Sequence, residues 1–150
     1  MTRKLFSMPA WRGVLATALL ALSAPIPAHE YYAASFQIVH PWAHPAPAGT
    51  RTAGIYMRII EISADDRLVS ASTEIAERIE LRIPPRDATD ASTPAGIRLA
   101  AGSELSLSAA TAHLVLHGLN TELHQGRQYP LRLMFEKSGE VRVDFIVGAH

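Results

Sequence analysis

Short apolar and aromatic runs that alternate with polar residues recur along this chain, and they predict strands rather than helices. Near the C-terminus, Val143 and Phe145 have one parity while Arg142 and Asp144 have the other, so one face of that segment is apolar. Pro, Gly, Asn and Asp separate the runs. The strands expected on this basis are residues 35–40, 52–60, 66–72, 78–83, 96–100, 104–108, 112–118, 129–137 and 140–148.

About nine short strands at this spacing predict an all-β fold, a Greek-key β-sandwich or barrel. The segment KSGE (137–140) is expected to join the last two strands as a hairpin turn. No segment keeps a helical period, although STEIAER (72–78) is compatible with one helical turn.

The first 28 residues are typical of a secretory signal rather than of the fold. Three basic residues precede an apolar run at 13–22, and a Pro/Ala-rich stretch follows it. The run is too short to span a bilayer as a permanent helix, and small residues favour cleavage after Ala28. We therefore expect a signal peptide at 1–28, a single domain at 29–150 and a periplasmic location. An uncleaved membrane anchor is the alternative.

Charge and cysteine content narrow the function classes. The chain is formally neutral and has no basic run, so nothing indicates binding to nucleic acid or to an anionic membrane. Removal of residues 1–28 leaves 11 Lys and Arg against 14 Asp and Glu, a net charge of about −3. The absence of cysteine excludes blue-copper centres, iron–sulfur clusters and thiol nucleophiles. Because the common catalytic motifs are missing too, we do not expect an enzyme.

Several stretches of the chain, taken in order, resemble the periplasmic PCu(A)C-type copper chaperones. HPWAHPAPAGTRTAGIYM (40–57) is similar to the opening segment of that family, and the stretches at 66–82, 96–119 and 125–147 follow it in order. The resemblance implies a cupredoxin-like β-barrel that binds copper through two His and two or three Met. It also implies transfer of copper towards the copper centre of cytochrome oxidase, with oxidase assembly factors or another copper carrier as partners.

Matched position by position, the resemblance implies that most of these copper ligands are replaced here. The first His-x-Met pair corresponds to Arg82 and Pro84, and the next Met should fall within 86–100, which contains none. In the last pair His113 is retained and Val115 replaces Met. Thioethers select Cu(I), and a His-x-Met pair places both ligands on one face of a strand. His113 is therefore the one ligand of the family set expected here, and copper, as Cu(I) or Cu(II), is the expected metal.

His117 shares a strand face with His113 but cannot join it at one ion. Four residues at about 3.3 Å each separate the two positions by roughly 13 Å. Arg82, at a former ligand position, would repel copper unless its side chain turns away. Two interpretations of His113 stay open: a copper ligand, or a partly buried histidine hydrogen-bonded to the backbone.

The remaining histidines offer other metal candidates. After cleavage at Ala28, His29 would present its α-amine and imidazole together, a good chelate for Cu(II), and a frayed terminus is the alternative. His40 and His44 flank Trp42 in a Pro-rich segment that we expect to be a loop. There we expect Trp42 to plug the end of the barrel and both histidines to be solvated.

The two methionines of the strands, Met57 and Met134, are expected to pack in the core rather than to bind metal. His124 and His150 are expected to be exposed. Two function classes then remain. In the first, a periplasmic copper-binding or copper-transfer protein uses His113 with other ligands, such as His29 or a methionine of a partner. In the second, a copper-free member of the same fold acts as a binding or assembly module outside the cytoplasm.

Overall fold

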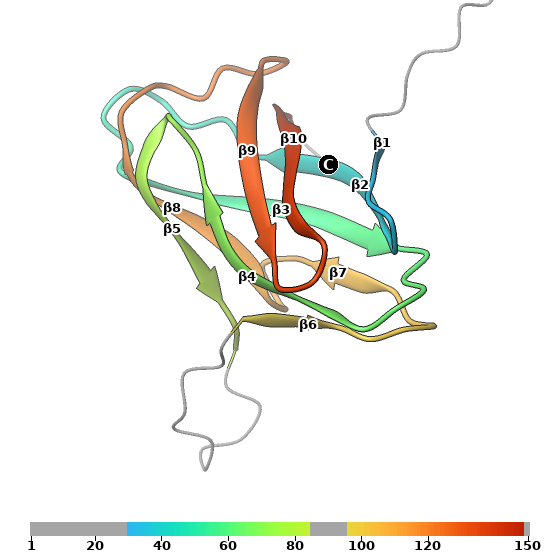
Figure 1. The fold of residues 1–150 in the computed structure, drawn as a ribbon. Coiled ribbons are helices and arrows are strands. Elements are labelled where there is room, and N and C mark those ends of the chain that lie inside the picture. Colours follow the sequence, from blue (N-terminus) through green and yellow to red (C-terminus); the bar gives the residue numbers. More distant parts are fainter. Residues whose placement is uncertain (1–29, 85–95, 149–150) are drawn as a thin grey trace, which may run out of the picture.

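The computed structural model describes residues 30–84 and 96–148 (Figure 1). Within these ranges all of the elements are β-strands. The all-β prediction is therefore confirmed. Nothing in the described ranges forms a helix long and apolar enough to cross a membrane. The ten strands are β1 (Glu30–Tyr32), β2 (Gln37–Ala43), β3 (Thr52–Ile60), β4 (Asp66–Ser72), β5 (Ala76–Arg82), β6 (Ile97–Leu99), β7 (Leu105–Leu107), β8 (His113–Leu119), β9 (Gln128–Phe135) and β10 (Gly139–Val147).

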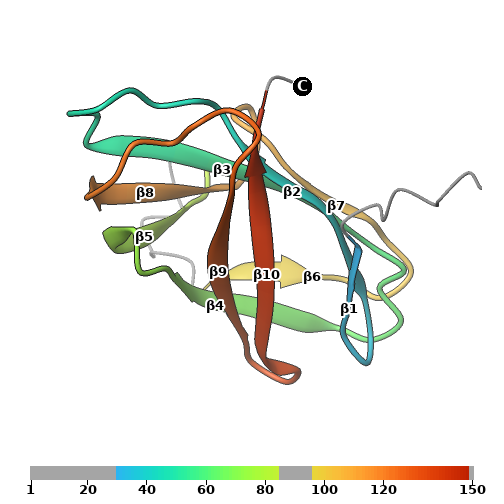
Figure 2. The same cartoon turned by 90° about the horizontal axis from the view of Figure 1, so that it is seen from above.

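A single curled sheet holds these strands in the order β5-β8-β3-β2-β10-β9-β4-β6, with β1 paired to β2 and β7 paired to β3. All the pairings are antiparallel except the one between β10 and β2, which is parallel. In Figures 1 and 2 the sheet wraps around so that β4 and β9 lie opposite β3 and β8. The result is a nearly closed barrel, which confirms the predicted fold class.

Alternating side chains from the whole curled sheet fill the interior of the barrel. On β9, Leu131, Leu133 and Phe135 are buried, and the ring centroid of Phe135 lies 4.5 Å from that of Phe36 at the start of the domain. Met57 belongs to the same core and is 2% exposed. The packing role predicted for Met57 is confirmed.

Met134 does not pack in the core, and the prediction for it is wrong. Its side chain is 39% exposed. Successive residues of a strand point to opposite faces, so Met134 shares the outward parity of Arg132 rather than the inward parity of Leu133. The alternation along β9 already predicts an outward Met134, whereas the apolar character of methionine favours the core.

The predicted strand boundaries agree best with the observed ones where the alternation of apolar and polar residues is longest. β3 and β4 coincide with the predicted segments at 52–60 and 66–72, and the hairpin turn between β9 and β10 is confirmed. Residues 72–78, although compatible with one helical turn, do not form one, because β5 begins at Ala76 and pairs along its length with β8. This pairing overrides a weak local helix preference. β1 was not predicted, since three residues carry too little pattern.

β2 continues through the Pro-rich segment that was expected to be a loop. Its register against β3 shifts between Val39 and Trp42, so two residues of β2 face one residue of β3. His40 lies in this bulge with a φ of 49°, a left-handed conformation that bulges accommodate. Trp42 is consequently paired with Tyr56 on the sheet face, and the prediction that it plugs the barrel end is wrong.

One buried carboxylate attaches the β9–β10 turn to the start of β4. Asp66 is 5% exposed and accepts hydrogen bonds from the backbone N–H groups of Arg67 (2.7 Å), Lys137 (2.9 Å) and Ser138 (3.0 Å) and from the Ser138 hydroxyl (2.6 Å). Burial alone would raise the pKa of Asp66, but these four hydrogen bonds outweigh it and lower the pKa below its ordinary value. The charged carboxylate is therefore the form that holds the hairpin in place.

Candidate functional site

Aromatic and imidazole rings form a continuous row across the outer face of β8, β3 and β2. Trp42 and Tyr56 are register partners with ring centroids 4.8 Å apart. Leu114 pairs with Ile55, so His113 comes to lie beside Tyr56, with 5.8 Å between the ring centroids. We call the four residues His113, Tyr56, Trp42 and His44 the aromatic row.

His44 forms the other end of the aromatic row. Its ring meets that of Trp42 edge-on, with centroids 4.8 Å apart and an interplanar angle of 85°. Edge-to-face contacts of this kind are favourable because the positive edge of one ring meets the negative face of the other. His44 itself is exposed, as is His40, so the predicted solvation of both histidines is confirmed.

A glycine in the middle of β3 lets the aromatic row lie flat on the sheet. Tyr56 folds back over Gly54, and a Cβ built at Gly54 would collide with the Tyr56 hydroxyl and ring. Glycine inside a strand often marks such a close approach. Tyr56 was not singled out by the sequence, although Gly54 two residues before an aromatic residue was the available signal.

His113, the copper ligand expected from the resemblance, has one ring nitrogen held by the backbone. His113 is half-buried at the start of β8, and its Nδ1 lies 3.1 Å from the backbone oxygen of Thr111. A carbonyl oxygen can only accept, so this hydrogen bond puts the proton on Nδ1 and leaves Nε2 with a free lone pair in the neutral ring. Orientation of one ring nitrogen by a backbone carbonyl is common for metal-binding histidines.

Arg82 lies directly opposite His113. The two residues are register partners in the antiparallel pair of β5 and β8, so their side chains leave the sheet on the same face. The Arg82 guanidinium turns along its own strand to Glu80, with Nε–Oε1 and Nη2–Oε2 distances of 3.2 Å. The charge that was expected to repel copper is therefore paired with a carboxylate.

Glu80 also binds His117, and this explains why His117 is not available as a second ligand beside His113. The His117 Nε2 lies 2.7 Å from the Glu80 Oε2. Hydrogen bonds from Arg82 and then from His117 lower the pKa of Glu80 to about 2. Within residues 30–84 and 96–148, no three His, Asp or Glu side chains come close enough together to hold a metal ion.

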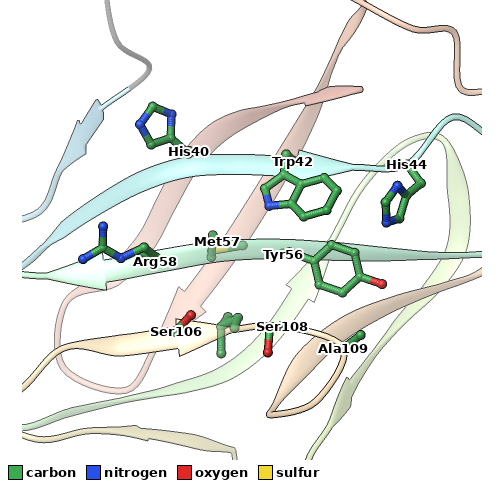
Figure 3. Close-up of a pocket in the computed structure, with 10 residues that line it drawn as sticks. His40, Trp42, His44, Tyr56, Met57, Arg58, Ser106, Ser108 and Ala109 are labelled. Atoms are coloured by element: carbon green, nitrogen blue, oxygen red, sulfur yellow. The ribbon is translucent and has the colours of Figure 1, made fainter. Parts of the chain in front are cut away.

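A pocket of about 290 Å³ opens beside the aromatic row, over β2, β3 and β7 (Figure 3). Trp42 and Tyr56 form one end of it, and Arg58 lies at the other end. Ser106 and Ser108 line the β7 side, and His40 and His44 stand at the β2 side, to the left and right of Trp42 in the figure. No local motif predicts this pocket, because its walls combine β2 and β3 with β7, which is distant from them in the chain.

Among the described residues, the histidines considered as metal candidates do not come together around one ion. His113 and Trp42 are two strand spacings apart, roughly 10 Å, and Tyr56 and Trp42 separate His113 from His40 and His44. His29 and His150 lie outside the described residues, as does most of the segment 86–100 where the family's further methionine was expected. His124 is about half exposed, and its Nδ1 lies 3.5 Å from a carboxylate oxygen of Glu122.

Comparison with known proteins relates the chain to copper-binding domains. A family model described as "Putative lipoprotein LpqE-like" matches residues 36–147. The apo PCuAC domain from PmoF1 superposes with a TM-score of 0.70 and 26% identity, covering 81% of this chain and 100% of that one. The copper-bound PCuAC domain from PmoF2 gives a TM-score of 0.69, 26% identity, and coverages of 81% and 99%. The Cu(I) form of DR1885 from Deinococcus radiodurans, at 20% identity, a TM-score of 0.59 and coverages of 72% and 74%, shares the fold. Among curated proteins none matches.

Proposed function

This chain belongs to the LpqE-like family, and from that membership we propose that it is an extracytoplasmic copper-binding protein that holds copper through imidazole and amine nitrogens. The observation that carries the proposal is the similarity over most of the chain to a PCuAC domain whose structure contains copper. Binding and carrying a metal, rather than catalysis, fits a fold in which we identified no catalytic motif. We propose the periplasm as its compartment, reached by cleavage of residues 1–28. No cysteine occurs in the 150 residues, so none of them can carry a thioether-linked lipid.

Nitrogen ligands are proposed because the described residues place no exposed thioether at the aromatic row. Met57 lines the adjacent pocket but is only 2% exposed and packs in the core, and Met134 lies on β9, away from the row. Amine and imidazole ligands suit Cu(II), whereas thioethers select Cu(I). The oxidation state proposed for bound copper is therefore Cu(II).

The first proposed ligand position is the processed amino terminus at His29. A free His29 offers an amine and an imidazole, which together form a chelate. β1 pairs antiparallel with β2 with Glu30 opposite Val39, and the next residue of β2 is the exposed His40. Consecutive Cα atoms are about 3.8 Å apart, so His29 starts one such step from Glu30. We propose His40 as the additional imidazole of this position.

The second proposed position is His113. Its Nε2 is free, and Arg82 opposite it is turned towards Glu80. A single imidazole binds copper weakly, so this position depends on a ligand from elsewhere, such as a methionine of a partner. We propose that it takes part in transfer of copper to an acceptor. From the family resemblance we propose that this acceptor is an assembly factor of the cytochrome oxidase copper centre.

The test is a Cu(II) titration of the exported protein, with its first residue established by mass spectrometry. We expect the substitutions His29→Ala and His40→Ala each to weaken the tighter binding about tenfold or more, ~1.4 kcal/mol. We expect His113→Ala to remove only weaker binding. His124→Ala is the matched control, since it removes an exposed imidazole from another part of the surface. A wild-type protein that binds Cu(II) no more tightly than its unfolded form refutes the proposal.

A copper-free binding module is the second candidate function, and one observation favours it. The ion pair between Arg82 and Glu80 occupies the place where the resemblance implies a metal ligand. Such a pair has no role in binding a cation but can take part in recognition of a polar partner. Absence of copper binding by a folded exported protein would select this candidate.

A further inference from the structure

The pocket beside the aromatic row has features that copper binding does not use. Its volume of about 290 Å³ lies at the lower end of the range for ligand sites, roughly 300–1,000 Å³. It opens on the outer face of the barrel, and the buried core residues Met57 and Leu107 are among the residues that line it. A site of this size takes a small molecule.

One end of the pocket is aromatic. The rings of Trp42 and Tyr56 are tilted by 47° to one another, with 4.8 Å between their centroids. In Figure 3 both rings show a broad face on the open side of the sheet. A planar aromatic group stacks on such faces more favourably than its buried area alone would give.

The other end of the pocket presents hydrogen-bond donors. Arg58 and Ser106 are register partners on β3 and β7, so both side chains stand on the pocket face. The Arg58 Nη2 donates to the Glu104 Oε2 at 2.8 Å, but a guanidinium carries five N–H donors in a planar fork. Donors therefore remain for an anion, and none of the described residues that line the pocket is acidic.

We propose that this pocket binds a small aromatic carboxylate, with its ring against Trp42 and Tyr56 and its carboxylate on Arg58 and Ser106. The class follows from the two ends together: an aromatic surface selects a flat ring, and a guanidinium beside a hydroxyl selects a planar anion. Glu104 competes with the ligand for Arg58. Removal of Glu104 should therefore strengthen binding, while removal of Arg58 should weaken it.

The experiment titrates benzoate into the exported protein, with a metal chelator present so that copper plays no part. Trp11 and Trp42 are the only tryptophans of the sequence, and the proposed cleavage after Ala28 removes Trp11, so the fluorescence reports the surroundings of Trp42. We expect saturable quenching with a dissociation constant of about 1 mM or below, given the size of the ligand. Benzamide lacks the charge and cyclohexanecarboxylate lacks the flat ring, and both should bind more weakly.

Two substitutions in one ion pair decide the role of the donor end. Arg58→Gln should weaken benzoate binding about tenfold, equivalent to ~1.4 kcal/mol, whereas Glu104→Gln should strengthen it. Both changes break the same ion pair, so a merely structural effect would move both variants in the same direction. Arg142→Gln breaks a comparable exposed pair with Glu140 and should change nothing. Equal weakening by all three substitutions, or no saturation by about 10 mM benzoate, overturns the proposal.

Discussion

An imidazole placed opposite His113 should create a metal site between β5 and β8. The perturbation is Arg82→His, which places a second imidazole at the register partner of His113. Directly opposite Cα atoms in an antiparallel pair lie about 4.5–5.5 Å apart. Two imidazoles on one face at this separation can both reach a Zn²⁺ ion at about 2.0–2.1 Å. Zinc is the probe because it has no redox chemistry.

The size of the effect follows from linkage between binding and folding. Zinc at about 100 times its dissociation constant stabilises the folded state by about 2.7 kcal/mol. For a chain of this length, 1 kcal/mol shifts the midpoint of thermal unfolding by roughly 4 °C, so the variant should gain about 10 °C. Without zinc the variant should unfold close to the wild type, because the lost Arg82–Glu80 pair is exposed and contributes about 0–1 kcal/mol.

The assay is thermal unfolding with and without zinc, for the wild type, Arg82→His and the double variant Arg82→His/His113→Ala. The double variant retains every other histidine and so measures zinc bound elsewhere. A folded single variant that gains no more than the double variant would refute the register between β5 and β8, or the orientation of His113 by Thr111. Either result would also remove the basis for calling position 82 a former ligand position.

Other predictions concern stability. Asp66→Asn should lower the free energy of unfolding at neutral pH by about 2–4 kcal/mol, because the new amide nitrogen faces N–H donors and two charge-assisted hydrogen bonds are lost. Denaturant unfolding measures this loss, and a value below about 0.5 kcal/mol contradicts the prediction. The pKa of Asp66 is lowered from 3.8 in the folded state, so the carboxylate's contribution is complete above that value and disappears as pH falls through the folded-state pKa. The wild type and Asp66→Asn should therefore converge in stability in acid, and a constant difference would show that the charge is not the cause. Met57→Ala should cost about 2–4 kcal/mol and Met134→Ala less than about 1 kcal/mol; equal losses would contradict their placement on opposite faces.

Local patterns were sufficient for the elements whose alternation is long and one-sided. The boundaries of β3 and β4 were predicted to the residue, and the inward positions of β9 follow from parity alone. The failures have physical causes. Met134 was expected in the core because methionine is apolar, but its position in the alternation of β9 places it on the outer face. Residues 72–78 do not form a helical turn because pairing with β8 decides the conformation of β5.

The candidate site was less predictable than the fold. Arg82 faces His113, and Glu80 contacts His117, through the pairing of β5 with β8, which no local spacing encodes. The pocket depends on the bulge at His40, which turns a Pro-rich segment into part of a strand and sets Trp42 against Tyr56. A bulge adds one residue to a pairing, and its position is visible only when both strands are known.

The sequence by itself determined the all-β class, the core faces of the long strands, the lack of thiolate chemistry and the family resemblance. Each of these depends on residue identity or on the two-residue period of a strand. Only the tertiary structure decided which side chains meet across strands: His113 with Arg82 and Tyr56, Glu80 with His117, and Arg58 with Ser106. Register is a relation between segments distant in the chain, and it is set by packing of the whole barrel rather than by any one segment.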